Sequence, residues 1–348
     1  MNRFPWHASV WNVMQKRIDR LPQAMLIVAD HGTGKMGFAT CLAGLLLCES
    51  KEGTRPCCEC KACRMMVEGR HPDLHVVTNE AVSAAAFPFL SDHIYRYAPG
   101  NLQKKSNPSK LGNIIGVEQI REVSKALQMT AVRGWNRVCM IYPAEALNIN
   151  AANALLKILE EPGSGIHFLL PTSALHGLPP TIRSRCSVLK LPNPTPEEAI
   201  SWLAGIEGVD RDLAHTLLTY GFGALEIQQI FEDGEPGKLA AFPSQVAEFA
   251  GHRDSANLIV SNLLDIGPRL GLRLIQQQLF KSYRMLVESG PTDEPLVNVL
   301  QANLGKDDLN KLFTKIGRYL QWPVGAVDER LFLEDIAHSL YRSGAGGR

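Results

Sequence analysis

The sequence predicts a chain of two parts, an α/β domain with a mostly parallel sheet followed by an all-helical half. Three observations predict this organisation. Short β-type runs alternate with helical patterns through the first 190 residues, an order typical of a parallel sheet covered by helices on both faces. A glycine-rich turn at 29–36 separates the first strand from an apolar helix. From 192 to 341 the patterns are helical throughout.

Composition places the chain among globular proteins. Its 348 residues include 36 Lys plus Arg and 35 Asp plus Glu, for a formal net charge of +1. This balance argues against a protein that coats DNA through overall basicity. Hydrophobic residues make up 45% of the chain, but their runs are far shorter than the ~20 residues of a membrane span. The N-terminus lacks the pattern of a secretory signal, so the sequence predicts a cytoplasmic protein.

The first half contains five runs that predict strands. Each run is short and rich in apolar side chains, as expected for strands of a buried parallel sheet. The runs lie at 24–28, 74–77, 137–142, 166–170 and 188–191.

Helices are expected between these strands. A helix with apolar residues at helical spacing follows Ser9, which we expect to be its N-cap. Further helical patterns lie at 117–127 and at 150–161, where Pro162 ends the second pattern. Residues 81–112 break the alternation with three prolines, so we expect them to form an excursion over the surface.

The second half begins after a proline-rich linker that contains Pro192, Pro194 and Pro196. Thr195 stands where it can cap the first helix of this half. Helical patterns follow at 197–203, 210–219, 225–231, 242–250, 256–264, 270–287, 294–304, 307–321 and 327–340. A weaker break at 232–237 divides them into a short group and a longer one.

The turn at 29–36, with the sequence ADHGTGKM, has the strand-to-helix context of a phosphate-binding loop. Gly32, Gly34 and Lys35 stand where such a loop cradles phosphate with backbone amides and reaches it with an ammonium group. The hydroxyl that holds Mg²⁺ is replaced by Met36, whose thioether is a poor ligand for a hard cation. We therefore expect a turn that has lost nucleotide binding. The alternative is residual nucleotide binding without hydrolysis.

The acidic residues of an ATPase are also missing. Such an enzyme needs carboxylates at the end of a neighbouring strand to hold Mg²⁺ and to polarise water. The strand at 137–142 ends in Tyr142 and is followed by Pro143, and neither residue can do this work. Glu145 stands two positions further along, a shift that would not restore the geometry. We expect no productive binding of ATP and Mg²⁺ by this chain.

Four cysteines have the spacing of a structural zinc site. Zn²⁺ accepts four thiolates in a closed tetrahedral site that stabilises a loop and performs no chemistry. The expected ligands are Cys48, Cys57, Cys60 and Cys63. Most of the residues between them cannot build a hydrophobic core, so the metal would supply the ordering energy.

Three alternatives to this zinc set remain open. An iron–sulfur cluster is disfavoured because Val67 stands where its fourth cysteine is expected. Cys58 or His71 can substitute for Cys48 as the fourth ligand. The four thiols can also lie without metal in a surface loop.

Two further motifs complete a family resemblance. Residues 153–162 (NALLKILEEP) and 181–186 (TIRSRC), together with the four cysteines, resemble the bacterial clamp-loader AAA+ family of DNA polymerase III. The degraded phosphate loop resembles the delta-prime branch of that family. Ala224 strengthens this resemblance, because active relatives carry an Arg at the matching place.

The resemblance implies a fold in three parts. An α/β P-loop domain of the AAA+ RecA-like type, with a parallel sheet and the zinc module at about 48–63, is expected at 1–190. A small helical lid is expected at 191–238, and an all-α collar for oligomerisation at 239–348.

The resemblance also implies a function and partners. We expect a subunit without intrinsic ATPase activity in a DNA-directed DNA polymerase holoenzyme, a nucleotidyltransferase. It would join gamma/tau-type ATPase subunits and one delta subunit in a pentameric ring that loads the sliding clamp on primer-template DNA during replication, without membrane contact.

Arg185 is the candidate catalytic residue, acting in trans. At a subunit edge its guanidinium can reach the γ-phosphate of ATP held by the neighbouring subunit and stabilise the transition state. Arg183, two positions earlier, is expected to face elsewhere. The alternative role of Arg185 is a surface ion pair with a carboxylate.

Two other functions are weighed against this one. The chain can be an active ATPase of the same family, which Met36, Tyr142 and Pro143 argue against. It can also be a zinc-dependent nucleic-acid-binding protein, which the balanced net charge and the absence of interleaved aromatic residues disfavour.

Overall fold

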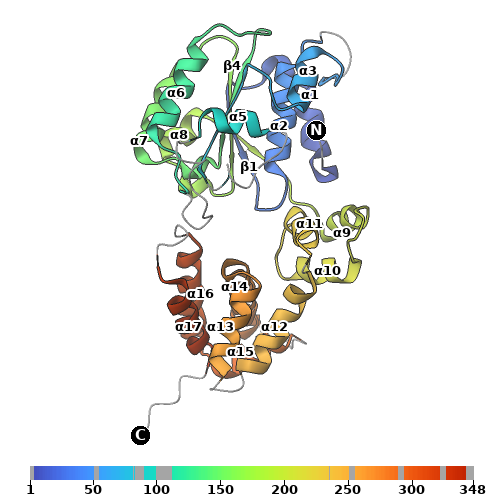
Figure 1. Ribbon diagram of the computed structural model, residues 1–348, viewed down its shortest axis with the longest axis vertical. Helices are drawn as coiled ribbons and strands as arrows, with labels where there is room; N and C mark the ends of the chain where they lie inside the picture. Colours follow the sequence, from blue (N-terminus) through green and yellow to red (C-terminus); the bar gives the residue numbers. More distant parts are fainter. Residues whose placement is uncertain are drawn as a thin grey trace. The chain divides into compact units, whose positions relative to one another are not determined.

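The computed structural model describes residues 4–50, 55–80, 82, 90–98, 112–234, 236–250, 255–288, 294–321 and 327–341. The chain divides into two compact units, Met1–Glu198 and Ala199–Arg348, which are considered one at a time (Figure 1). The first corresponds to the predicted α/β part. The predicted boundary between a lid and a collar inside the second stays a prediction.

The first unit is built on a five-stranded parallel sheet. Its strand order is β2-β3-β4-β1-β5, and all its strand pairs are parallel. The strands are β1 (Ala24–Val28), β2 (Leu74–Thr78), β3 (Arg137–Tyr142), β4 (Ile166–Thr172) and β5 (Ser187–Lys190). Each lies at or within two residues of its predicted run. Because the strands are parallel, the turns that follow β1, β3 and β4 lie at one edge of the sheet.

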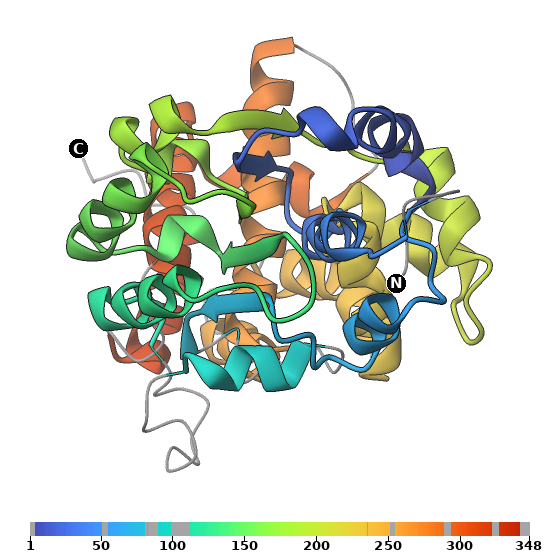
Figure 2. The same ribbon diagram turned by 90° about the horizontal axis from the view of Figure 1, so that it is seen from above.

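Helices cover both faces of this sheet, as predicted (Figure 1, Figure 2). Alternate β1 residues serve the two faces, with Met25 and Ile27 in one hydrophobic cluster and Ala24 and Leu26 in the other. The first cluster includes α1 (Ala8–Lys16), α2 (Lys35–Leu47), α3 (Lys61–Val67) and α5 (Ser91–Arg96). The second includes α6 (Val117–Gln128), α7 (Ile149–Glu160) and α8 (Pro180–Arg185).

Two local predictions in this unit are wrong. Helix α1 begins at Ala8, with His7 rather than Ser9 as its N-cap and no side-chain cap bond. The stretch 81–112 is not wholly a surface excursion, because it contains α5, whose His93 and Ile94 are buried. Apolar contacts of α5 with β2 override the proline signal. The rest of that stretch, apart from Val82, Leu90, Tyr97, Ala98 and Gly112, lies outside the described residues.

The predicted cap at the start of the second half is confirmed. The backbone N–H of Glu198 donates to Thr195 Oγ1 at 3.2 Å, and the Thr195 N–H donates to Glu198 Oε2 at 2.9 Å. These reciprocal bonds form a capping box, which satisfies two amides at a helix start. The box explains why α9 (Pro196–Leu203) begins at the last proline of the linker.

The second unit is helical throughout its described residues. One hydrophobic cluster draws on all its helices. They are α9, α10 (Arg211–Thr219), α11 (Ala224–Glu232), α12 (Pro236–Ala250), α13 (Ala256–Asp265), α14 (Pro268–Glu288), α15 (Pro295–Asn303), α16 (Lys306–Gln321) and α17 (Glu329–Ser339).

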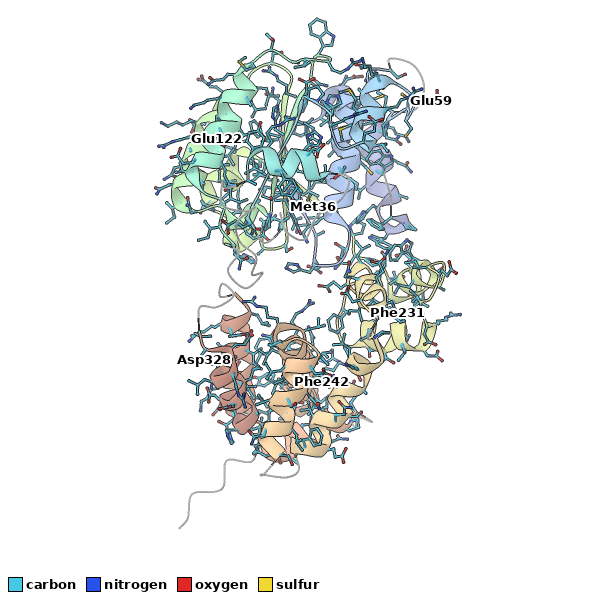
Figure 3. The ribbon with its side chains drawn as sticks, viewed as in Figure 1. Met36, Glu59, Glu122, Phe231, Phe242 and Asp328 are labelled. Carbon is cyan, nitrogen blue, oxygen red and sulfur yellow. The ribbon has the colours of Figure 1, made fainter. Side chains whose placement is uncertain are left out.

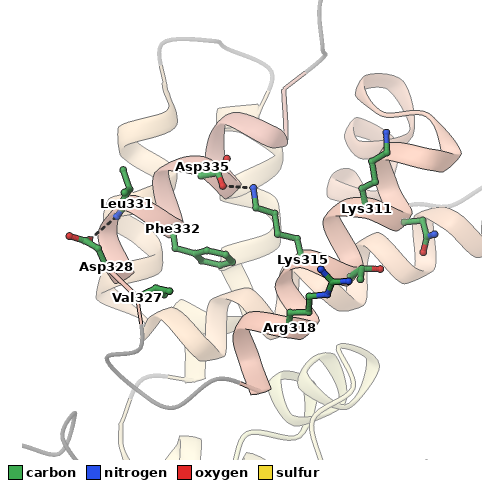
Figure 4. A pocket seen from close by; sticks show the side chains of 10 residues that line it. Lys311, Lys315, Arg318, Val327, Asp328, Leu331, Phe332 and Asp335 are labelled. Carbon is green, nitrogen blue, oxygen red and sulfur yellow. Dashed lines mark hydrogen bonds and ion pairs between the residues drawn. The ribbon is translucent and has the colours of Figure 1, made fainter.

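Helix α12 is longer than predicted, because it begins at Pro236 and continues through Pro243. Proline suits the first turn of a helix, and at Pro243 the loss of one backbone bond is offset by burial beside Phe242. A groove between α16 and α17 is lined by cationic side chains such as Lys315 and Arg318 and by apolar ones such as Phe332 (Figure 4). None of the helices described has the length and hydropathy needed to cross a bilayer.

Candidate functional site

The phosphate-loop residues connect β1 to α2 at the carboxyl edge of the sheet. Gly32 and Gly34 have positive φ angles of 69° and 94°, and Gly34 is the N-cap of α2. Side chains with a Cβ rarely adopt such angles, so the two glycines are required for the turn. The loop therefore keeps the backbone form expected from the sequence.

Hydrogen bonds within the first unit engage polar groups of the loop. The Lys35 ammonium, 4% exposed, donates to the Asp30 carbonyl at 3.2 Å. Thr33 Oγ1 donates to the same carbonyl at 2.8 Å. Trp6 Nε1 donates to the Thr33 carbonyl at 2.8 Å, and Asn193 Nδ2 donates to Asp30 Oδ2 at 2.6 Å. Side chains from before β1 and after β5 thus hold the loop in place.

Met36 is part of the protein core. It is 5% exposed and belongs to the same hydrophobic cluster as Phe38 and Leu42 of α2; Figure 3 marks it in the first unit. A Mg²⁺-dependent loop has a hydroxyl here. In this chain the position supplies apolar packing instead of a metal ligand.

The turn after β3 uses its carboxylate for structure. Glu145 lies in a 3₁₀ turn (Ala144–Ala146), and its Oε1 accepts a hydrogen bond from the Ser173 N–H, just after β4, at 3.0 Å. This bond joins two turns at the sheet edge. As predicted, β3 ends at Tyr142 and Pro143 follows it, and neither residue supplies a carboxylate.

The four predicted cysteines come together. Their Sγ atoms all lie within 4.8 Å of one another, and those of Cys57 and Cys63 are 4.0 Å apart. Tetrahedral Zn²⁺ with Zn–S bonds of about 2.3 Å separates its sulfurs by about 3.8 Å. Cys48 directly follows α2, and Cys60 is the N-cap of α3. The donor set and its spacing fit a closed four-thiolate site.

Backbone amides point at three of these sulfurs. The N–H groups of Cys57, Cys60 and Cys63 donate to the sulfur of the preceding cysteine of the set at 3.3–3.5 Å. The Cys60 and Glu59 amides lower the pKa of the Cys57 thiol to about 6. Burial raises the pKa of Cys48 and Cys63. The amides favour the thiolate form, the form that binds metal.

The alternative fourth ligands lie apart from the cluster. Cys58 is exposed, has a positive φ of 60°, and its Sγ is 3.7 Å from the Pro56 carbonyl oxygen. His71 is buried, and its Nδ1 accepts a hydrogen bond from the Asp73 N–H at 3.2 Å. Within the described part of the chain, the group that converges is the one containing Cys48.

Arg185 lies at the end of α8 and is held by its own chain. Its Nη2 is 2.5 Å from Glu160 Oε1, and its Nη1 donates to the Thr181 carbonyl at 3.2 Å. The two charged side chains are 35% and 49% exposed. The ion pair considered as an alternative role is therefore present, and the guanidinium remains at the surface. Arg183 is half-buried on the same helix.

Comparison with known families identifies the chain. A family model described as DNA polymerase III, delta subunit, matches residues 6–195, which is more than half of the chain. The chain belongs to this family. The match runs from the aromatic segment before β1 to the linker after β5, and so includes the phosphate loop, the cysteine cluster and Arg185. The AAA+-like fold class predicted for the chain is confirmed.

Curated relatives of the family are named DNA polymerase III subunit delta′. The protein from Pseudomonas aeruginosa is 32% identical over 201 residues, covering 58% of this chain and 52% of its own. That from Escherichia coli strain K12 is 31% identical over 206 residues, covering 59% and 53%. The chain thus spans about half the length of these relatives. The resemblance to the delta-prime branch is confirmed.

Among solved structures, a DNA polymerase III gamma subunit-related protein from Thermotoga maritima aligns with 95% of this chain and 99% of its own. The identity is 16% and the TM-score 0.44.

The structure adds residues that sequence reasoning missed. Trp6 and Asn193 fasten the phosphate loop, and Glu160 pairs with Arg185. No spacing rule links Trp6 or Asn193 to a loop so far along the chain. A signal for Glu160 did exist, because a carboxylate at the end of a helix is a local conflict that calls for a cation.

Proposed function

We propose that this chain is a delta-prime-type subunit of the DNA polymerase III clamp loader and hydrolyses no ATP itself. The main support for this proposal is the geometry of the phosphate loop. Lys35 is turned onto the Asp30 carbonyl, and Met36 is buried where a Mg²⁺ ligand is needed. Hydrolysis needs that metal, a polarising carboxylate and a free lysine, and the described loop supplies none of the three.

The proposed partners are those of the family. The chain assembles with gamma/tau-type ATPase subunits and one delta subunit in a pentameric ring, which loads the sliding clamp on primer-template DNA during replication. The α/β domain at 1–190 carries the sites described above. The lid at 191–238 and the collar at 239–348 provide surfaces for assembly. Family membership supports this assignment.

Within the ring, Arg185 is proposed to act on the ATP of the adjacent subunit. Its guanidinium lies at the surface at the end of α8, where a neighbouring subunit can reach it. Charge stabilisation by an arginine supplied from a neighbouring subunit accelerates phosphoryl transfer by roughly 10³ to 10⁵.

The cysteine cluster is proposed to bind one Zn²⁺ with a structural role. The ligands are Cys48, Cys57, Cys60 and Cys63, whose convergence and amide hydrogen bonds support the assignment. The metal would cross-link the end of α2 to the start of α3. The chain would supply the four thiolates and the two helices that hold them.

One experiment separates this function from an active ATPase. The purified chain is assayed for ATP turnover alone and after mixing with ATPase and delta subunits, with size-exclusion chromatography to follow ring formation. We expect no turnover by the chain alone and a stoichiometric ring with the partners. Steady-state turnover by the isolated chain that disappears in Lys35→Ala would contradict the proposal.

The same material tests direct nucleic-acid binding. A salt titration of the isolated chain against DNA should show negligible affinity at physiological ionic strength, since the net charge is only +1. Tight, salt-dependent binding that requires the cysteine cluster would favour the zinc-dependent nucleic-acid-binding protein instead.

A further inference from the structure

Helix α7 ends with an unfavourable arrangement of charge. Its last residue is Glu160, and Glu161 follows directly before Pro162. The C-terminus of a helix carries partial negative charge, so it favours cations and disfavours carboxylates. Local conflicts of this kind are expected where a side chain has a task other than stabilising its own helix.

Arg185 relieves this conflict for one of the two carboxylates. Its Nη2 makes the short ion pair with Glu160, and its Nη1 donates to the Thr181 carbonyl. Glu161 is exposed and makes no ion pair or hydrogen bond within the described residues. The two glutamates therefore have the same charge at the same helix end but different contacts.

These contacts leave part of the Arg185 donors available. A guanidinium has five N–H groups; Nη2 donates to Glu160, and Nη1 donates to the Thr181 carbonyl at 3.2 Å and to Ser184 Oγ at 3.5 Å. Both partners of the ion pair are more than a third exposed, and pairs of this kind are weak. Such a pair restricts the rotamers of a long side chain without preventing new contacts.

We propose that Glu160 is a positioning residue for Arg185. It holds the guanidinium in one orientation at the surface, with donors left for the phosphate oxygens of a neighbouring subunit. The arginine then loses its conformational entropy when the subunit folds, and not when the transition state forms. The barrier to hydrolysis is therefore lower, which raises kcat and leaves KM unchanged. This inference rests on the proposed role of Arg185 as an arginine finger.

The test uses the assembled complex with Glu160→Ala, Glu160→Gln, Arg185→Ala and the double variant Glu160→Ala/Arg185→Ala. Arg185→Ala defines the part of the ATP hydrolysis rate that depends on Arg185. In Glu160→Ala this part should fall roughly two- to fivefold, the range expected for an exposed ion pair. Glu160→Gln keeps an acceptor oxygen and should give an intermediate loss. KM for ATP should not change, and the double variant should match Arg185→Ala.

Glu161→Ala is the matched control and should hydrolyse ATP at the wild-type rate. Ring assembly and thermal unfolding of each variant show that it is folded. An equal loss in Glu161→Ala, or a further loss in the double variant beyond that of Arg185→Ala, would overturn the positioning role. If Arg185→Ala lowers the rate but Glu160→Ala and Glu160→Gln do not, only this inference fails. If Arg185→Ala has no effect, the finger role itself fails.

Discussion

Individual side chains in this protein take up contacts that a working ATPase site would need to keep free. Lys35 donates to the carbonyl of Asp30, and Met36 packs in the core. Arg185, by contrast, stays at the surface with spare donors. At the scale of the residue, the polar groups of the phosphate loop are bonded within the chain, whereas the Arg185 guanidinium remains partly exposed.

Replacing Arg185 should affect the ring and not the fold. Arg185→Ala should leave folding and ring assembly unchanged and lower ATP hydrolysis by the complex, together with clamp loading stimulated by DNA. The loss should be partial, because in the proposed ring only one of several composite ATP sites would use this residue. Lys should not rescue it, since a point charge cannot reproduce the planar fork that engages two phosphate oxygens.

Steady-state hydrolysis and clamp-loading assays on the reconstituted complex measure this effect. Arg183→Ala is the control on the same helix and should retain activity. If assembled Arg185→Ala complexes hydrolyse ATP and load the clamp at unaltered rates, Arg185 has no catalytic role and only forms an ion pair with Glu160.

Buried histidines should make the stability of the first unit depend on pH. Burial lowers the pKa of His75 and His93 to about 4, whereas a histidine in an unfolded chain titrates near 6.5. Between these values the unfolded chain binds more protons, so the free energy of unfolding falls as the pH falls from 6.5 towards 4. Above pH 6.5 this contribution is complete.

Urea unfolding at pH 7 and pH 5 measures the slope. His93→Gln removes one titrating group and should reduce the loss of stability between the two pH values, whatever its effect at pH 7. The same pH dependence in the wild type and in His93→Gln would show that His93 does not contribute.

At the scale of the element, the segment from the end of α2 to α3 depends on its cysteines. None of the described residues between Cys48 and Cys60 is buried, so a bound metal would supply much of the ordering energy there, on the order of 10 kcal/mol for structural zinc at neutral pH. Cys60→Ser should therefore release the metal and loosen the segment while the sheet stays folded.

Elemental analysis and hydrogen exchange check this outcome. We expect about one equivalent of zinc in the wild type and none in Cys60→Ser, with faster amide exchange confined to α3 and its flanks. Cys58→Ser is the control and should keep the metal, since Cys58 points to the Pro56 carbonyl. Freshly purified wild type without zinc would contradict the assignment.

Elements were predictable where their pattern is local. The strands of the sheet are short apolar runs between turn residues, and Thr195 and Glu198 stand at capping-box spacing, so both could be read from neighbouring residues. Helix α5 could not, because its burial against β2 depends on a tertiary contact that overrides a proline-rich context. The same limit applies to Trp6, whose indole N–H bonds a carbonyl 27 residues away.

The whole molecule divides into two compact units at residue 198. One hydrophobic cluster extends from Ile200 to Tyr341 and draws on α9 through α17. A cut inside that cluster would expose core side chains, whereas a cut after Glu198 follows the boundary between the two compact units.

A chain ending at Glu198 should therefore fold, bind zinc and fail to join the ring, because it lacks the proposed assembly surfaces. Circular dichroism, zinc content and co-purification with the ATPase subunits measure the three properties. A truncated chain that still enters a stoichiometric ring would assign assembly to the first unit.

The hydrogen bonds within the phosphate loop have a consequence for how the protein would respond to nucleotide. A ligand that binds the native state stabilises a fold by an amount that rises with the logarithm of the ratio of its concentration to its Kd. Trp6, Lys35 and Asn193 complete the loop with groups of the chain itself. If the proposed function holds, the stability of this chain does not depend on the ratio of ATP to ADP, and its geometry should stay constant while the neighbouring subunits of the proposed ring hydrolyse ATP.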